Sequence, residues 1–567
     1  MRMGNDRPLI VQSDRSILAE VDSPAYPEAR DALCQFAELE KSPEHIHTYR
    51  ITPLSLWNAA ASGLDAEAIL ADMARYARYE IPPNVEVDIR EFIGRYGRVR
   101  LVASDGEIHL VSDDRALIAE LVNHKQVAPL LTRQIDPGRL GVARHMRGHI
   151  KQALIRLGFP VEDLAGYVEG APLPMGLREH LSDNRPFVIR GYQQEAAQSF
   201  WARGSARGGS GVIVLPCGAG KTIVGMVAMS LVERQTLILT TSVTAVRQWQ
   251  RELLEKTTLG EDQIGEYTGE VKLTRPVTIT TYQMLTYRHD QDGPFPHFEL
   301  FTQMDWGLII YDEVHLLPAP VFRITAEIQT RRRLGLTATL VREDGHEGDV
   351  FSLIGPKRYD VPWKTLEAQG WIAQAECIEV RLPMPSEARM AYALANHRTK
   401  FRLASENPDK LDVVATLLQH HRDDMVLIIG QYLDQVHTLA DRIGAPIITG
   451  RTPSGERDRL YDEFRSGRLH HLIVSKVGNF AIDLPDANVL VQLSGAFGSR
   501  QEEAQRLGRI LRPKRDGSVA RFYSLVTRES KEQEFAMNRQ LFLTEQGYRY
   551  RIVDVNALLG DVSAARR

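Results

Sequence analysis

The stretch "GVIVLPCGAGKT" at residues 211–222 has the pattern of a buried strand, a glycine loop and the start of a helix. Its first half is rich in β-branched apolar residues, which is typical of a strand inside a parallel sheet, and apolar residues recur at helical spacing after Thr222. The usual phosphate-binding pattern has a glycine at the position of Leu215. The loop alone therefore leaves open an ordinary strand-to-helix turn.

We expect this loop to bind the phosphates of a nucleotide. Its glycines let backbone N–H groups converge on phosphate oxygens, and the N-terminus of the following helix adds a favourable dipole. Lys221 is expected to reach the β and γ phosphates, and Thr222 is expected to be a magnesium ligand. The predicted nucleotide-binding residues of the loop are Pro216, Cys217, Gly218, Ala219, Gly220, Lys221 and Thr222.

A second stretch, "WGLIIYDEVHLLPA" at residues 306–319, supplies two carboxylates at the end of another apolar strand. Open parallel sheets bind ligands at the carboxyl ends of their strands. Asp312 is expected to hold Mg²⁺ through its water shell, and Glu313 to orient and deprotonate the attacking water. A solvated acidic turn is the alternative for an isolated pair, but together with the glycine loop the pair predicts nucleotide hydrolysis.

Composition excludes several other classes of protein. The formal net charge of −4 gives no general signal for a polyanion-binding protein, although a local basic groove remains open. The three cysteines lie far apart and form no C-x-x-C pair, so we expect neither a disulfide framework nor a zinc site. The longest apolar runs have the length of strands. These features predict a cytoplasmic protein with no membrane partner.

The chain of 567 residues is too long for a single core. The fold class we predict is α/β, with two RecA-like parallel-sheet lobes in tandem behind a smaller α/β accessory region. The predicted boundaries are 1–125 for the N-terminal accessory region, 126–186 for a helical connector, 187–375 for lobe 1 with the ATP site, 376–405 for a short thumb-like helical connector and 406–567 for lobe 2.

Lobe 2 has no phosphate loop, but it carries "EEAQRLGRILRPK" at residues 502–514. The arginines at 506, 509 and 512 recur at a spacing of three, which on a helix directs Arg509 and Arg512 to nearly the same side. An exposed basic helix is one reading. The other makes Arg509 and Arg512 candidate arginine fingers that act on the nucleotide held by lobe 1.

The motifs "IRGYQ", "LPCGAGKT", "TTSVTAVRQW", "TTYQML", "DEVH", "GLTAT" and "QRLGRILR" occur in the order found in superfamily 2 helicases. The stretches "LGLTATLVREDG", "NPDK" and "SKVGNFAIDLPDANVLVQ" resemble more closely the XPB (xeroderma pigmentosum group B) family. This resemblance implies an ATP-dependent 3′ to 5′ DNA helicase that acts in DNA repair such as nucleotide excision repair, with ATP and Mg²⁺ as cofactors.

The resemblance also implies roles for individual residues. Arg190 and Gln193 would read the adenine, and Lys221, Asp312 and Glu313 would act as argued above. From the second lobe, the residues that would complete the site are Asp483, Gln505, Arg509 and Arg512. The residues that would line or couple to the nucleic-acid track are Ser242, Gln248, Trp249, Thr281, Tyr282, His315, Thr337, Thr339 and Gln431. The stretch Arg342, Glu343 and Asp344 resembles an element expected to help separate strands.

Several alternatives remain open at this point. The same chemistry could drive a duplex translocase without strand separation, or the substrate could be RNA. A non-catalytic DNA-binding scaffold is a third reading, which the full set of catalytic residue types opposes. The long acidic insertion of eukaryotic relatives is missing, which implies a prokaryotic, nucleoid-associated protein. Its expected partners are single-stranded and forked DNA, and a nuclease or another repair protein.

Overall fold

The computed structural model describes residues 7–41, 45–104, 106–205, 207–216, 218–288, 295–329, 331–338, 347–361, 366, 369, 371, 375–475, 487–494, 519–545 and 549–558. The chain forms two compact units. The first comprises Met1–Glu38, Tyr49–Leu215 and Gly220–Val361, and the second comprises Leu39–Thr48, Pro216–Ala219 and Pro362–Arg567. Every helix among the described residues is too short or too polar to span a lipid bilayer.

The accessory region begins with a four-stranded sheet in the order β1-β2-β4-β3. Its strands are β1 (Leu9–Val11), β2 (Ser16–Glu20), β3 (Glu38–Lys41) and β4 (Ile46–Arg50). Its helices are α1 (Tyr26–Leu33), α2 (Pro53–Ala61), α3 (Ala66–Tyr76) and α4 (Pro83–Arg95). Thr52 caps α2 by accepting a hydrogen bond from the Ser55 amide at 3.0 Å.

A second accessory sheet has five strands in the order β7-β8-β6-β5-β9. The strands are β5 (Val99–Ser104), β6 (Glu107–Val111), β7 (Leu131–Asp136), β8 (Arg139–Val142) and β9 (Val161–Leu164), and the helices are α5 (Arg115–Asn123) and α6 (Arg147–Arg156). The predicted boundary at residue 125 and the helical connector over 126–186 are corrected here, because three of these strands lie in that connector. β7 is a polar edge strand without apolar alternation, so its sequence carries no strand signal.

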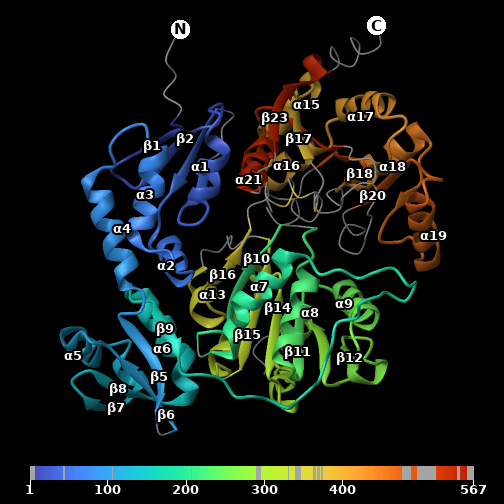
Figure 1. The fold of residues 1–567 in the computed structure, drawn as a ribbon. Helices are drawn as coiled ribbons and strands as arrows, with labels where there is room; N and C mark the ends of the chain where they lie inside the picture. Colours follow the sequence, from blue (N-terminus) through green and yellow to red (C-terminus); the bar gives the residue numbers. More distant parts are fainter. Residues whose placement is uncertain are drawn as a thin grey trace. The chain divides into compact units, whose positions relative to one another are not determined.

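Lobe 1 contains a seven-stranded sheet in the order β12-β13-β11-β14-β15-β10-β16 (Figure 1). All its neighbouring strands run parallel. The strands are β10 (Ser210–Val214), β11 (Thr236–Thr240), β12 (Ile264–Tyr267), β13 (Val277–Thr281), β14 (Leu308–Asp312), β15 (Arg332–Thr337) and β16 (Lys357–Asp360). The predicted parallel-sheet lobe is confirmed.

The helices of lobe 1 are α7 (Gly191–Trp201), α8 (Lys221–Val232), α9 (Val243–Lys256), α10 (Tyr282–Leu285), α11 (Leu300–Gln303), α12 (Ala319–Glu327) and α13 (Glu347–Leu353). Alternate residues of the strands point to opposite faces of the sheet. On one face Leu237, Ile309 and Tyr311 pack in one buried cluster with Phe322 of α12 and Val350 of α13. The core therefore lies between this face and the helices that cover it.

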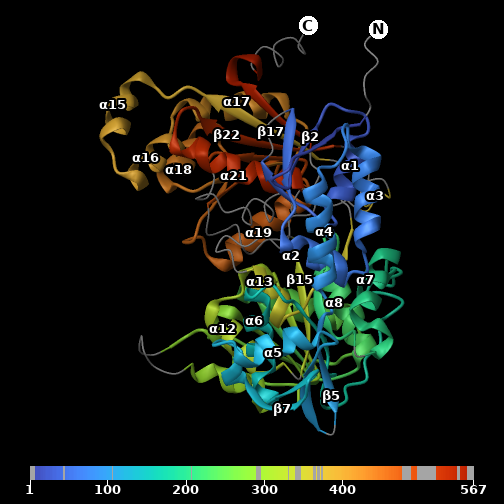
Figure 2. The same cartoon turned by 90° about the vertical axis from the view of Figure 1, so that its left-hand side faces the viewer.

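Apart from Leu39–Thr48, the accessory region belongs to the same compact unit as the sheet of lobe 1, and α6 packs against lobe 1. Figure 2 shows α6 beside α12 and α13, with which it makes extensive contact. A Cβ atom on Gly148 of α6 would lie 2.4 Å from the carbonyl oxygen of Ala326, so only glycine permits this approach. Gln152 also donates a hydrogen bond to Asp349 at 2.7 Å.

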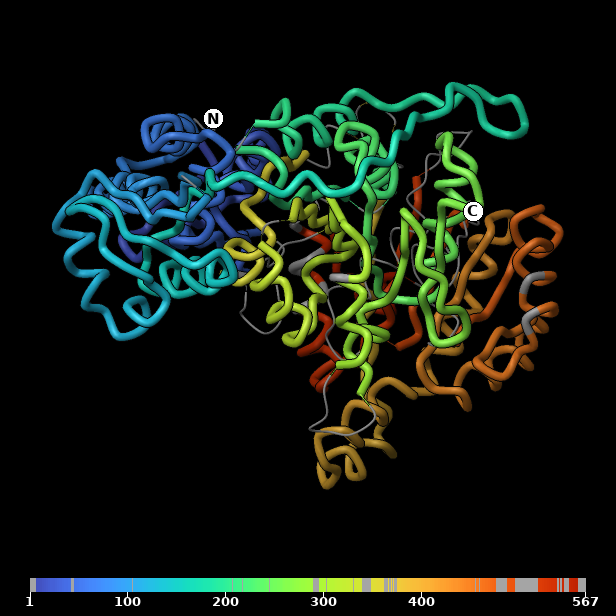
Figure 3. Tube along the Cα trace, turned by 90° about the horizontal axis from the view of Figure 1, so that it is seen from below, coloured from blue at the N-terminus to red at the C-terminus, as the bar shows by residue number. Residues whose placement is uncertain are grey.

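The chain between α6 and α7 runs as an extended segment along lobe 1 (Figure 3). Its backbone donates hydrogen bonds from Leu173 to the Glu233 carbonyl at 3.0 Å and from Arg178 to the Lys256 carbonyl at 2.9 Å. Residues after Leu164 are therefore bound to lobe 1 by main-chain bonds. They do not form the helical connector predicted for this part of the chain.

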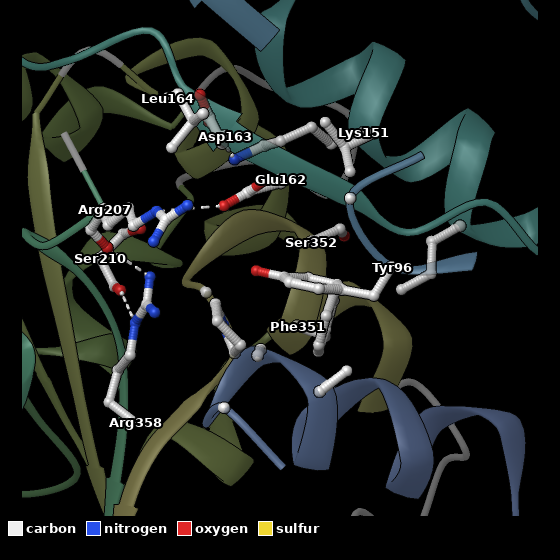
Figure 4. A pocket seen from close by; sticks show the side chains of 18 residues that line it. Tyr96, Lys151, Glu162, Asp163, Leu164, Arg207, Ser210, Phe351, Ser352 and Arg358 are labelled. Carbon is white, nitrogen blue, oxygen red and sulfur yellow. Dashed lines mark hydrogen bonds and ion pairs between the residues drawn. The ribbon is translucent and has the colours of Figure 1, made fainter. Parts of the chain in front are cut away.

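A buried charge cluster and a cavity of about 290 Å³ lie at the joint of the accessory region with lobe 1 (Figure 4). Asp163 accepts from Arg147 at 2.7 Å and from Lys151 at 3.0 Å. Burial, which Asp163 only partly offsets, lowers the pKa of Lys151 to about 7. Tyr96 directs its hydroxyl into the same cavity.

Lobe 2 contains a second seven-stranded parallel sheet, in the order β19-β20-β18-β21-β22-β17-β23. Its strands are β17 (Ala375–Leu382), β18 (Val426–Gly430), β19 (Ile447–Ile448), β20 (His471–Ser475), β21 (Val489–Gln492), β22 (Ala520–Thr527) and β23 (Arg549–Asp554). Its helices are α15 (Ser386–Leu394), α16 (His397–Ser405), α17 (Asp409–His420), α18 (Leu433–Ile443), α19 (Ser454–Arg465) and α21 (Lys531–Glu545).

The thumb-like connector predicted for residues 376–405 is only partly helical. α15 and α16 occupy its second part, but its first residues form β17, which pairs with β22 and β23 inside the sheet of lobe 2. Lobe 2 therefore begins about thirty residues earlier than predicted. The first strand was missed because a short apolar run does not distinguish a strand from a helix.

Candidate active site

The glycine loop begins where β10 ends and α8 starts. Gly218 and Gly220 both have φ of +81°, in the left-handed region that favours glycine. Gly220 caps α8, and its carbonyl accepts hydrogen bonds from the backbone amides of Ile223 at 3.0 Å and Val224 at 3.2 Å. Leu215, which stands where the usual pattern has glycine, is fully buried and donates its amide to the Thr337 carbonyl at 2.9 Å. It thus extends the pairing of β10 with β15 and lies outside the tight part of the loop.

Lys221 and Glu313 meet at the carboxyl ends of the strands of lobe 1. Their Nζ and Oε1 atoms are 3.2 Å apart, and both side chains are largely buried. Glu313 has φ of +52°. A left-handed glutamate costs about 1–3 kcal/mol of backbone strain, which persists only where the surrounding structure fixes it.

Asp312 and Glu313 are adjacent buried carboxylates with opposite pKa shifts. Burial and the charge of Glu313 raise the pKa of Asp312 to about 6. Burial also opposes ionisation of Glu313, but the charges of Lys221 and His315 outweigh it and lower the pKa of Glu313. The site therefore stabilises Glu313 as a carboxylate beside Lys221.

His315 and Thr337 connect the carboxyl end of β14 to that of β15. The Nδ1 atom of His315 lies 2.7 Å from Oγ1 of Thr337 and 3.6 Å from Oε2 of Glu313. Because β14 and β15 are parallel neighbours, the residues that follow β14 and those that end β15 lie at the same end of the sheet. The structure therefore brings His315, Thr337 and Glu313 together at one end of the sheet.

Arg190 and Gln193 stand at the start of α7. Gln193 is buried and accepts a hydrogen bond from the Arg190 amide at 3.0 Å. A Cβ atom on Gly220 would lie 2.6 Å from Nε2 of Gln193, so the missing side chain at Gly220 leaves room for this amide. Gln193 is thus a direct neighbour of the glycine loop.

The sequence matches three family models. They are described as ERCC3/RAD25/XPB C-terminal helicase over residues 366–564, type III restriction enzyme, res subunit, over 186–342, and helicase conserved C-terminal domain over 9–136. It is 55% identical to a DNA 3′-5′ helicase XPB of Mycobacterium tuberculosis, across 98% of this chain and 99% of that protein. The chain belongs to the XPB family of helicases. Its identity to the protein of the same name from Kineococcus radiotolerans is 54%, across 99% of both chains.

A more distant XPB relative is the general transcription and DNA repair factor IIH helicase/translocase subunit XPB of Antonospora locustae. The identity is 35%, across 96% of this chain and 81% of the relative. The similarity of this XPB-family chain to its relatives therefore extends through the accessory region as well as through both lobes.

The residues that the XPB resemblance assigned to a nucleic-acid track differ in their burial and contacts. Ser242 and Thr281 cap α9 and α10, each accepting from a backbone amide of the helix, and Gln248 is half-buried on α9. Trp249 and Tyr282 are instead buried, and both donate hydrogen bonds to Asp312 at 2.9 Å. In lobe 2, the backbone N–H of Gln431 donates to the Ser494 hydroxyl oxygen at 2.8 Å.

Some predicted residues lie outside the described part of this XPB-family chain. They are Cys217, Thr339, Arg342, Glu343, Asp344, Asp483, Gln505, Arg509 and Arg512. The sequence alone does not predict the contacts of Trp249 and Tyr282 with Asp312. Tyr282 is the first residue of α10 and Trp249 lies inside α9, so neither position reveals which strand its side chain reaches.

Proposed function

We propose that this chain is an ATP-dependent DNA helicase that moves 3′ to 5′ and opens duplex DNA during repair. The pairing of Lys221 with Glu313 beside Asp312, at the end of parallel strands and behind a glycine loop, is the observation that carries the proposal. The names of the two most similar relatives given above support the substrate and the polarity.

The loop fits ATP in two respects. Gly218 and Gly220 adopt a backbone conformation that exposes amides, and α8 offers its positive N-terminus to phosphate oxygens. Lys221 would exchange its contact with Glu313 for the β and γ phosphates. Arg190 and Gln193 would hold the adenine, because Gln193 already lies against Gly220.

Thr222 and Asp312 are the residues we propose to hold Mg²⁺. Within the described ranges, no group of three or more His, Cys, Asp or Glu side chains could hold a metal. Few protein ligands suit Mg²⁺, which keeps several waters and binds through one or two carboxylates and substrate phosphates. When bound, the ion would neutralise charge on the phosphates.

Glu313 is the proposed general base. Lys221 and His315 keep its carboxylate ionised, so it can accept a hydrogen bond and then a proton from water. His315 and Thr337 are proposed to relay the state of the site along β15, because they join Glu313 to the end of that strand.

The remaining parts of the proposal concern the second lobe and the nucleic acid. Arg509 and Arg512 would act as arginine fingers, and Asp483 and Gln505 would complete the site from the second lobe. Ser242, Gln248, Thr281 and Gln431 would contact the DNA backbone, and the stretch Arg342, Glu343 and Asp344 would help to separate strands. Because DNA is the proposed substrate, we expect a nucleoid location and a nuclease or another repair protein as partner.

Strand displacement on 3′-tailed and 5′-tailed duplexes tests this proposal. We expect ATP-dependent displacement of the 3′-tailed substrate, and stronger stimulation of ATP hydrolysis by DNA than by RNA. Displacement of a triplex strand without opening of a duplex would replace the helicase by a duplex translocase. Stimulation by RNA alone would overturn the proposed substrate, and an absence of hydrolysis would leave a DNA-binding scaffold.

A further inference from the structure

Two buried aromatic residues hold Asp312 from two sides. The indole Nε1 of Trp249 donates to the carboxylate Oδ2, and the Tyr282 hydroxyl donates to the main-chain carbonyl of the same residue, both at 2.9 Å. Trp249 is 2% exposed and Tyr282 is 4% exposed. Side chains this deeply buried are unsuited to line a groove for nucleic acid.

The ring of Trp249 is fixed by the helix of the phosphate loop. A Cβ atom on Gly225 of α8 would lie 2.5 Å from Cη2 of the ring, so the ring occupies the space that a side chain would take. Gly225 follows Lys221 by one helical turn. The indole therefore lies between the helix that carries Lys221 and the strand end that carries Asp312.

This contact determines how the Asp312 carboxylate is oriented. An indole has a single N–H donor with a fixed direction. A hydrogen bond from it to Oδ2 restricts rotation of the carboxylate about its Cβ–Cγ bond, and hydrogen bonds to charged acceptors are stronger than those between neutral groups. The Tyr282 bond restricts the main chain of the same residue.

We propose that Trp249 is a positioning residue that orients Asp312 for Mg²⁺, and that Tyr282 supports it through the main chain. This inference rests on the proposed function, because it takes Asp312 to be the magnesium ligand. Both residues would act through Asp312 and would touch neither nucleotide nor metal.

Binding of fluorescent ADP, measured with Mg²⁺ and with EDTA, tests the inference on the full chain. The readout is the ratio of the two affinities, which reports how strongly Mg²⁺ assists binding. Trp249→Phe removes the donor and keeps an aromatic ring. We expect the ratio to fall by about tenfold, the size of a lost charge-assisted hydrogen bond, with little change in EDTA.

Trp306→Phe is the matched control. Trp306 is also fully buried in lobe 1, and its Nε1 donates to the Leu300 carbonyl at 2.8 Å, away from Asp312. We expect its Mg²⁺ ratio to equal that of the parent chain. Equal ratios for the parent and Trp249→Phe, or equal losses in the two tryptophan variants, would overturn the inference. A parent chain whose ADP binding is insensitive to Mg²⁺ would instead overturn the proposed function.

Gly225→Ala gives a second, independent test if Trp249→Phe fails to fold. Its methyl group would displace the indole while Trp249 is retained, so we expect the Mg²⁺ ratio to fall in the same way. In an Asp312→Asn background Gly225→Ala should add no further loss, because the group that it acts through has been removed. A loss that persists in that background, or no loss at all, would contradict the inference.

Discussion

The two lobes share one sheet topology, but they differ in the surroundings of a lysine that contacts the end of the fifth strand. In both sheets the strands of the lobe follow the order third, fourth, second, fifth, sixth, first and seventh. In lobe 1, Lys221 begins the helix after the first strand and reaches Glu313, the residue after the fifth strand. In lobe 2, Lys410 in the first turn of α17 donates to the carbonyl of Leu493, also the residue after the fifth strand, at 2.8 Å.

The surroundings of these two lysines differ sharply. Lys221 and Glu313 keep side-chain exposures of 13% and 17%, and they share one ion pair. Lys410 and Glu532 are both 0% exposed, and the ammonium contacts both carboxylate oxygens at 2.7 and 2.8 Å. The Thr527 amide also donates to Glu532. A partly solvated lysine can change partners, whereas one with its donors satisfied inside a core stabilises the fold.

Glu313→Gln tests the catalytic side of this comparison with the largest expected effect. The amide can still hydrogen-bond water but cannot take its proton, so turnover should fall by about 10²- to 10⁴-fold while ATP binding persists. ATP hydrolysis and nucleotide binding are measured on the same preparation. Near-parental turnover would remove Glu313 from the role of general base.

Lys410→Met tests the structural side. It leaves Glu532 as a buried carboxylate without its ion-pair partner, and breaking a buried pair in this way costs about 3–5 kcal/mol of unfolding free energy. Denaturant unfolding measures the loss. The double variant Lys410→Met with Glu532→Gln should recover part of it, because no buried charge remains. If Lys410→Met alone is as stable as the parent chain, Lys410 does not stabilise the fold, and the contrast with Lys221 fails.

Gln193→Ala has the smallest expected effect and tests whether Gln193 contributes to the adenine site of lobe 1. Removing the buried amide beside Gly220 should weaken ATP binding by roughly tenfold, as expected for one or two hydrogen bonds, and should reduce the preference for ATP over GTP. Gln194→Ala, on the adjacent half-buried residue, is the control. Unchanged affinity and unchanged preference in Gln193→Ala would exclude the residue from the adenine site.

Much of the local structure of the candidate nucleotide site could be predicted from sequence because its signals are local. A β-branched run, two glycines and Lys221 predict a strand, a loop and a helix, and Asp312 with Glu313 follows a second such run. The burial of Leu215 could not be predicted, because it depends on the pairing of its amide with Thr337 on a neighbouring strand.

Other features depend on contacts between distant segments. β7 carries mostly polar residues at the edge of its sheet, with no apolar alternation, so neither its strand nor the accessory boundary could be predicted. Trp249 was expected to face nucleic acid, since α9 alone does not reveal which neighbour its indole contacts. The buried bond with Asp312 arises only when α9 packs beside α8, which itself packs on β14.

Steady-state ATP hydrolysis with and without single-stranded DNA, on the parent chain and on Lys221→Ala, tests the central claim most directly. If lobe 1 is the ATP site of a DNA helicase, DNA stimulates the parent chain and Lys221→Ala loses hydrolysis in both conditions while it stays folded. Hydrolysis that survives Lys221→Ala, or a parent chain that DNA does not stimulate, would contradict the account.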